Sequence, residues 1–107
     1  MDDLGQLCDQ HLAQARSDPH GRSAHLVLHQ GPLRQTVIAL TAGSALDEHN
    51  APIAASVQAL RGSVALTTPG GDRTVLQGEI HAVPQERHGL RALEDAVVLL
   101  TAVTAVG

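Results

Sequence analysis

From Gly21 onward the sequence is divided into short apolar segments that are separated by glycine or proline. The segments are rich in Val, Leu, Ile and Thr, and a break follows roughly every eight to twelve residues. Short strands with regular turn signals are typical of an all-β sandwich or barrel, whereas βαβ units would need helices between the strands. The predicted strands are Ala24–His29, Arg34–Thr41, Ala54–Leu60, Ser63–Thr68, Thr74–Leu76, Ile80–Val83, Gly89–Ala92 and Val97–Val103.

Two of these segments carry further information. The sequence Pro69-Gly70-Gly71-Asp72 predicts a hairpin, because glycine readily adopts the positive φ that such turns demand. The segment Val97–Val103 is apolar on both faces in places, which predicts an interior strand or one that a second subunit covers.

The N-terminal segment has a helical period instead. Its apolar residues recur at helical spacing behind a capping aspartate, either Asp2 or Asp3, and Ser17-Asp18-Pro19 marks the end. We therefore expect one helix near residues 3–16, too short to be stable alone, which docks on the barrel or on a partner subunit. The chain is divided into a helix and linker, residues 1–20, and a barrel, residues 21–107, within a single domain.

Composition excludes several classes of partner. The 107 residues include no Phe, Tyr or Trp, so the core must come from aliphatic side chains, and no ring can stack on a base or a sugar. Seven Arg, no Lys and 11 acidic residues give a net charge of −4, which offers no basic face to nucleic acid or to an anionic membrane. Cys8 has no disulfide partner, and the acidic N-terminus does not resemble a signal peptide, so we expect a soluble cytoplasmic protein.

Two motifs in order carry a family resemblance. The first runs from Gly43 through His49 to Gly62, and the second runs from Gly78 through Pro84 to His88. At this spacing residues 22–104 resemble the cupin superfamily. The resemblance implies an all-β cupin jelly-roll barrel of about six to eleven strands, here with one short N-terminal α-helix, and often a homodimer.

The ligand positions of the motifs depart from the family pattern. In metal-binding cupins the motifs supply three His and one Glu, but here the second His falls on Ala51 and the Glu on Ala55. Only His49 and His88 remain, whereas a stably held ion needs at least three protein ligands. The expected cofactor is therefore none, or a divalent metal that His49 and His88 hold with additional help.

Other side chains could complete such a site. Gln58 shares a predicted strand with Ala55, although strand alternation places it on the opposite face unless a bulge intervenes. His81 lies on the strand after Gly78, and His25 and His29 are predicted to share one face of the first strand.

Charged residues near the two motif histidines are expected in loops. Asp47 and Glu48 are interpreted as part of a solvated loop at the barrel rim, as are Glu86 and Arg87, although Arg87 could pair with a substrate carboxylate. Arg34 and Arg61 flank strands and are expected to face water or a subunit boundary.

Three functions remain open on this basis. The first is a barrel that binds a small molecule near His49, Ala51, Ala55, Gln58 and His88, with no chemistry of its own. The alternative is a metal-dependent enzyme, an oxygenase or an isomerase, with a rebuilt metal site on His49 and His88. The third is a structural or interaction role in which side chains fill the cavity.

Overall fold

The computed structural model describes residues 2–49 and 54–104, which form one helix and nine strands. In chain order the elements are α1 (Leu4–Ser17), β1 (Arg22–Gln30), β2 (Leu33–Leu40), β3 (Ala45–His49), β4 (Ala54–Arg61), β5 (Val64–Thr67), β6 (Arg73–Val75), β7 (Ile80–Ala82), β8 (His88–Ala92) and β9 (Ala96–Val103).

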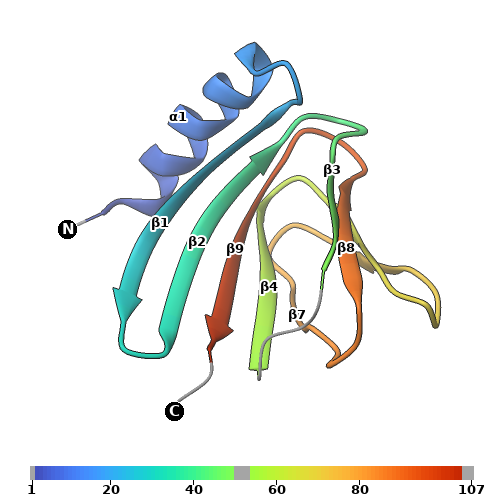
Figure 1. Ribbon diagram of the computed structural model, residues 1–107. Coiled ribbons are helices and arrows are strands. Elements are labelled where there is room, and N and C mark those ends of the chain that lie inside the picture. Colours follow the sequence, from blue (N-terminus) through green and yellow to red (C-terminus); the bar gives the residue numbers. More distant parts are fainter. Residues whose placement is uncertain (1, 50–53, 105–107) are drawn as a thin grey trace.

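The strands form two antiparallel sheets that face each other (Figure 1). The large sheet has the order β1-β2-β9-β4-β7 and the small sheet has the order β3-β8-β5-β6. The all-β prediction with one N-terminal helix is confirmed, and the arrangement is compatible with a cupin jelly roll. The prediction of a barrel needs correction, because no described strand pair joins one sheet to the other. β6 and β7 follow each other in the chain but are edges of different sheets, and three residues each give them little backbone to pair.

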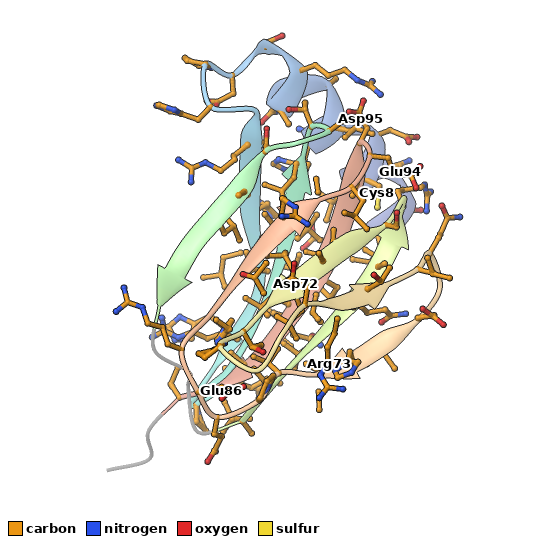
Figure 2. All side chains as sticks on the ribbon, turned by 90° about the vertical axis from the view of Figure 1, so that its right-hand side faces the viewer. Cys8, Asp72, Arg73, Glu86, Glu94 and Asp95 are labelled. Atoms are coloured by element: carbon orange, nitrogen blue, oxygen red, sulfur yellow. The ribbon has the colours of Figure 1, made fainter. Side chains whose placement is uncertain are left out.

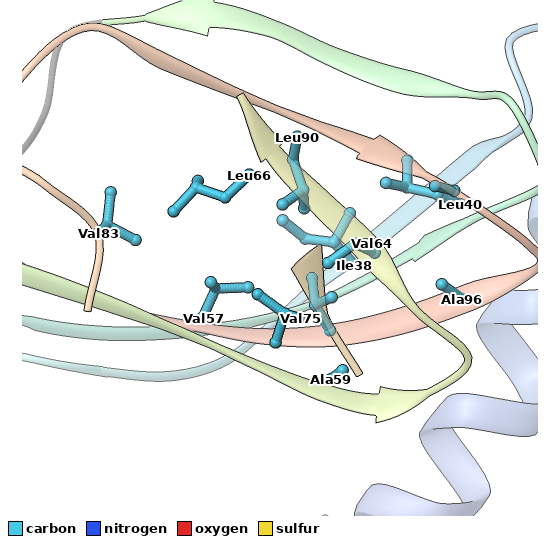
Figure 3. Close-up of a cluster of buried hydrophobic side chains, with 12 residues drawn as sticks. Ile38, Leu40, Val57, Ala59, Val64, Leu66, Val75, Val83, Leu90 and Ala96 are labelled. Carbon is cyan, nitrogen blue, oxygen red and sulfur yellow. The ribbon is translucent and has the colours of Figure 1, made fainter. Parts of the chain in front are cut away.

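The main core lies between the two sheets, where alternate residues of each strand point inward (Figure 3). It is aliphatic throughout, as the composition requires. Its fully buried members include Leu40 from the large sheet and Leu66 from the small sheet. The residues of this cluster are Ile38, Leu40, Val57, Ala59, Val64, Leu66, Val75, Val83, Leu90, Ala92, Ala96 and Val98.

The helix α1 docks on the outer face of the large sheet of its own chain (Figure 1). Asp3 caps it by accepting a hydrogen bond from the Gln6 amide at 3.0 Å, as one of the two predicted caps. Leu7, Cys8 and Ala15 are buried against Val37, Ala39 and Val97. The prediction of a docked helix is therefore confirmed, with the chain's own sheet as the surface. No helix among the described residues is long and apolar enough to cross a membrane.

One end of the sandwich is held together by four short connections, and we call it the closed end. They are the segments 41–44, 62–63, 76–79 and 93–95, each of which links a strand of one sheet to a strand of the other. Hydrogen bonds link them, from Leu93 N to Ser63 O at 3.0 Å and from Gly62 N to Gln77 Oε1 at 3.0 Å. In Figure 2 Asp95 and Glu94 lie at this end and Glu86 lies at the opposite end, which we call the far end.

The predicted strands agree with the observed ones except at β3. The segment Ala45–His49 forms a strand that pairs with β8, so Asp47 and Glu48 lie on a strand and the prediction of a loop is wrong for their backbone. The prediction for Val97–Val103 is confirmed as an interior strand, since β9 lies between β2 and β4. The predicted hairpin at residues 69–72 is also confirmed, because β5 and β6 pair in antiparallel fashion on either side of it.

Candidate functional site

A small cavity of about 20 Å³ lies between the sheets. That volume has room for about one water molecule. All but one of its lining side chains are apolar, and the exception is His88. The residues around it are Ile38, Leu46, Val57, Leu66, Val83, His88, Gly89, Leu90 and Leu100.

His88 begins β8 and is 5% exposed. Its Nδ1 lies 3.0 Å from the backbone carbonyl oxygen of Glu86. A carbonyl oxygen only accepts, so Nδ1 carries the proton and donates, and in the neutral ring Nε2 carries the lone pair. The bond therefore fixes the ring tautomer and holds a polar side chain at the wall of an apolar cavity.

Of the other positions of the predicted site, Ala55 is described in full, whereas His49 is described only in its backbone and Ala51 is not described. The backbone of His49 is directly opposite His88 in the β3–β8 pair, while its side chain and the whole of Ala51 lie outside the described residues. Ala55 is half-buried on β4 and packs against the main core from the far end. Its methyl group thus occupies the inward position where the resemblance implies a carboxylate.

This donor set does not fit a resident metal ion. Within residues 2–49 and 54–104, apart from side chains that the structure leaves undescribed, no three His, Cys, Asp or Glu side chains gather as a metal site would require. His88 with an alanine at position 55 falls short of three protein ligands even when His49 is added.

The additional candidates lie apart from His88. Gln58 pairs with Leu99, which packs under α1, so Gln58 is on the outer face of the large sheet. The register between β4 and β9 is regular from Ala55 to Ala59, and hence no bulge turns Gln58 inward. His81 is opposite Val57 on the edge strand β7, and its Nδ1 lies 2.6 Å from the Ala82 carbonyl oxygen, but it does not line the cavity.

The prediction that His25 and His29 share a face is wrong. The register of β1 against β2 shifts between Leu26 and Leu28, and this bulge reverses the alternation. His25 faces α1 and stacks on His11 with ring centroids 5.5 Å apart. His29 is opposite Arg34, which alternates with Ile38 along β2 and therefore shares the inner face of the large sheet.

Sequence reasoning assigned no role to Arg34 beyond facing water or a subunit boundary. The signal that could have placed it was the alternation 34, 36, 38 along β2, whose last member is a core residue. Arg34 itself is exposed.

At the level of sequence, no family model and no curated protein matches the chain. Solved structures do resemble it. A conserved protein of unknown function from Streptococcus pyogenes is 24% identical over 84% of this chain and 80% of its own, with a TM-score of 0.75. A cupin-2 domain containing protein from Shewanella frigidimarina is 10% identical over 96% of this chain and 94% of its own, with a TM-score of 0.74.

An enzyme also resembles the chain in structure. A salicylate 1,2-dioxygenase from Pseudaminobacter salicylatoxidans is 16% identical over 92% of this chain but only 33% of its own, with a TM-score of 0.76. Identities this low carry information on the fold and none on the activity. Because cupin proteins match the arrangement of its strands over most of its length, the chain is a small domain of the cupin fold.

Proposed function

We propose that this chain binds a small organic molecule at the far end of the sandwich, beside His88. The observation that supports the proposal is the buried imidazole of His88, whose orientation is fixed by the Glu86 carbonyl at the wall of an otherwise apolar cavity. A polar side chain buried among apolar ones is the usual composition of a small-molecule site.

The ligand in this proposal lies over the far end and not inside the core. A cavity of about 20 Å³ is far below the several hundred Å³ typical of an organic ligand. Ala55 and Ala102 are small, half-buried and adjacent across the β4–β9 pair, so their own side chains take up little of the space above the sheet. His49 and Ala51 belong to the proposed site by their place in the chain.

A second candidate is an interaction role with no ligand. It is favoured by the same small volume, since side chains nearly fill the described interior. The metal-dependent oxygenase or isomerase is less favoured, because Ala55 stands at the carboxylate position and offers no donor. Elemental analysis of the purified protein addresses that alternative directly: near-stoichiometric metal that disappears in His49→Ala and His88→Ala would replace the present proposal.

Ligand binding is tested by the methyl and imidazole NMR signals of Leu100 and His88. The probes are hexanol, hexanamide and hexanoate, which share an aliphatic body. Saturable shifts of both signals are expected, and Ala55→Leu should abolish them by filling the space above β4. The matched variant is Ala82→Leu, on an exposed position of β7, which should bind normally. If none of the three probes shifts His88 or Leu100, the proposal is wrong and the interaction role is favoured.

The homodimer implied by the resemblance is also a proposal. Leu26 and Leu28 are 48% and 37% exposed on β1, whose outer edge pairs with no other described strand. A second copy paired along this edge would cover both side chains. Light scattering after size exclusion should give a dimer mass that Leu26→Glu reduces to the monomer mass, and a monomeric wild-type protein would contradict the proposal.

A further inference from the structure

The inner face of the large sheet ends in a row of residues set by the strand register. Arg34 on β2 is directly opposite His29 on one side and Ala102 on the other, and Ala102 is opposite Ala55. Directly opposite residues of antiparallel strands share a face. The guanidinium of Arg34 and the imidazole of His29 therefore belong to the same face of the large sheet as Ala55, at the far end of the sandwich.

Arg34 has no acidic partner among the described residues, in contrast to Arg16 and Arg91. Arg16 binds Asp95 at 3.1 Å, and Arg91 lies 3.6 Å from Asp72. Among the described residues Arg34 makes no hydrogen bond and no ion pair. The row of Arg34 and the next row inward contain no carboxylate at their paired positions. The positive charge is therefore not neutralised within the sheet.

One uncharged row of residues separates the row of Arg34 from the cavity. The next row inward carries Thr36 beside Leu100, and Leu100 lines the cavity that contains His88. Two residues along a strand span about 7 Å, so the distance from the row of Arg34 to the row of Leu100 matches a short aliphatic chain. Ala102 and Leu100 are half-buried and uncharged.

We propose that Arg34, assisted by His29, recognises the carboxylate of a short-chain aliphatic acid whose hydrocarbon body lies over Ala102 and Leu100 toward His88. This inference rests on the proposed ligand site and names the class of its ligand. Arginine presents paired N–H donors that match the two oxygens of a carboxylate, and His29 offers a further ring N–H. The net charge of −4 for the whole chain opposes the approach of an anion, so the affinity for a carboxylate has to come from the local contacts with Arg34 and His29.

The experiment compares hexanoate with hexanamide, which has the same body and no charge. Hexanoate is expected to bind more tightly, and Arg34→Gln should weaken hexanoate about tenfold and leave hexanamide unchanged, because a charge-assisted hydrogen bond is lost. Arg91→Gln removes the same charge from the outward position of β8 and should have no effect on either probe. Binding is followed by calorimetry and by the shifts of Leu100 and His88.

The outcomes separate this inference from the function on which it rests. Equal affinity for hexanoate and hexanamide, unchanged in Arg34→Gln, would overturn the carboxylate site and leave the proposed ligand site in place. Equal weakening by Arg34→Gln and Arg91→Gln would show a general charge effect and would also overturn it. Failure of hexanol, hexanamide and hexanoate alike to shift Leu100 and His88 would overturn both proposals.

Discussion

Replacement of Gly62 by alanine tests how the closed end is built. Gly62 has a φ of +62°, and a Cβ on it would lie 2.2 Å from the carbonyl oxygen of Asp95 and 3.1 Å from the Cα of Ala96. Both neighbours are backbone, so the chain must move. Gly43 provides the matched control, because its φ is +83° and a Cβ there would meet nothing within 4 Å.

Gly43→Ala and Gly62→Ala share the cost of a left-handed backbone conformation, but only Gly62→Ala also has a steric cost. A left-handed backbone conformation costs an alanine about 1–2 kcal/mol at either position. Gly62→Ala adds the displacement of the Asp95–Ala96 backbone, and overpacking of this kind costs about 1–3 kcal/mol. We therefore expect Gly43→Ala to lower the free energy of unfolding by about 1–2 kcal/mol and Gly62→Ala to lower it by about 2–5 kcal/mol.

Urea unfolding followed by far-ultraviolet circular dichroism measures both values. Intrinsic fluorescence is not usable in a chain without Trp or Tyr, and concentrations must come from amino-acid analysis. If the two variants lose the same free energy within about 0.5 kcal/mol, the contact with Asp95 has no energetic weight and the reasoning is refuted.

Three further predictions concern other parts of the fold. The Ala42 amide and the Arg16 guanidinium lower the pKa of Asp95, so the contribution of Asp95 to the free energy of unfolding is present above the ordinary Asp pKa and is lost as pH falls through the lowered value. Asp95→Asn should therefore lower the free energy of unfolding by up to about 1 kcal/mol near neutral pH and should have no effect in strong acid. A difference between the variant and the wild type that persists when both are unfolded in strong acid would contradict this. Burial raises the pKa of the Cys8 thiol and hides it from reagents. Alkylation by iodoacetamide at pH 8 should therefore be at least about a hundredfold slower in the native protein than in urea. Equal rates in the two conditions would show that the thiol is exposed. Leu66→Ala should lower the free energy of unfolding by about 3 kcal/mol, compared with less than about 0.5 kcal/mol for the exposed Leu93→Ala, and similar losses in both would be inconsistent with the described core.

The elements that could be predicted from the sequence are those whose side chains follow a period. The helix followed from apolar residues at helical spacing, and strands such as β9 followed from runs of Val, Leu and Thr between turn residues. The strand β3 could not be found in this way, since Asp47 and Glu48 occupy its centre and its formation depends on pairing with β8.

The site was predictable only as far as alternation holds. Strand alternation predicted Gln58 on the other face of the sheet from Ala55, and the structure places it there, because the register of β4 against β9 is regular from Ala55 to Ala59. One extra residue between Leu26 and Leu28 was enough to separate His25 from His29, and no local pattern in the sequence marks that insertion. Arg34 was not singled out, because its position beside His29 and Ala102 comes from cross-strand pairing and not from a motif.

The closed end has a mechanical consequence for ligands larger than the cavity. The described strands of the two sheets share no backbone hydrogen-bond ladder, and the connections 41–44, 62–63, 76–79 and 93–95 join the sheets at the closed end. At the far end residues 83–87 also join β7 of the large sheet to β8 of the small sheet, so the two sheets can part beside His88 only as far as this connection allows, and such a parting separates aliphatic side chains of the main core. Each additional 40 Å² of apolar surface exposed in this way costs on the order of 1 kcal/mol, which a ligand that covers the same surface returns. A ligand larger than the cavity therefore has to offset the cost of every core contact that it separates.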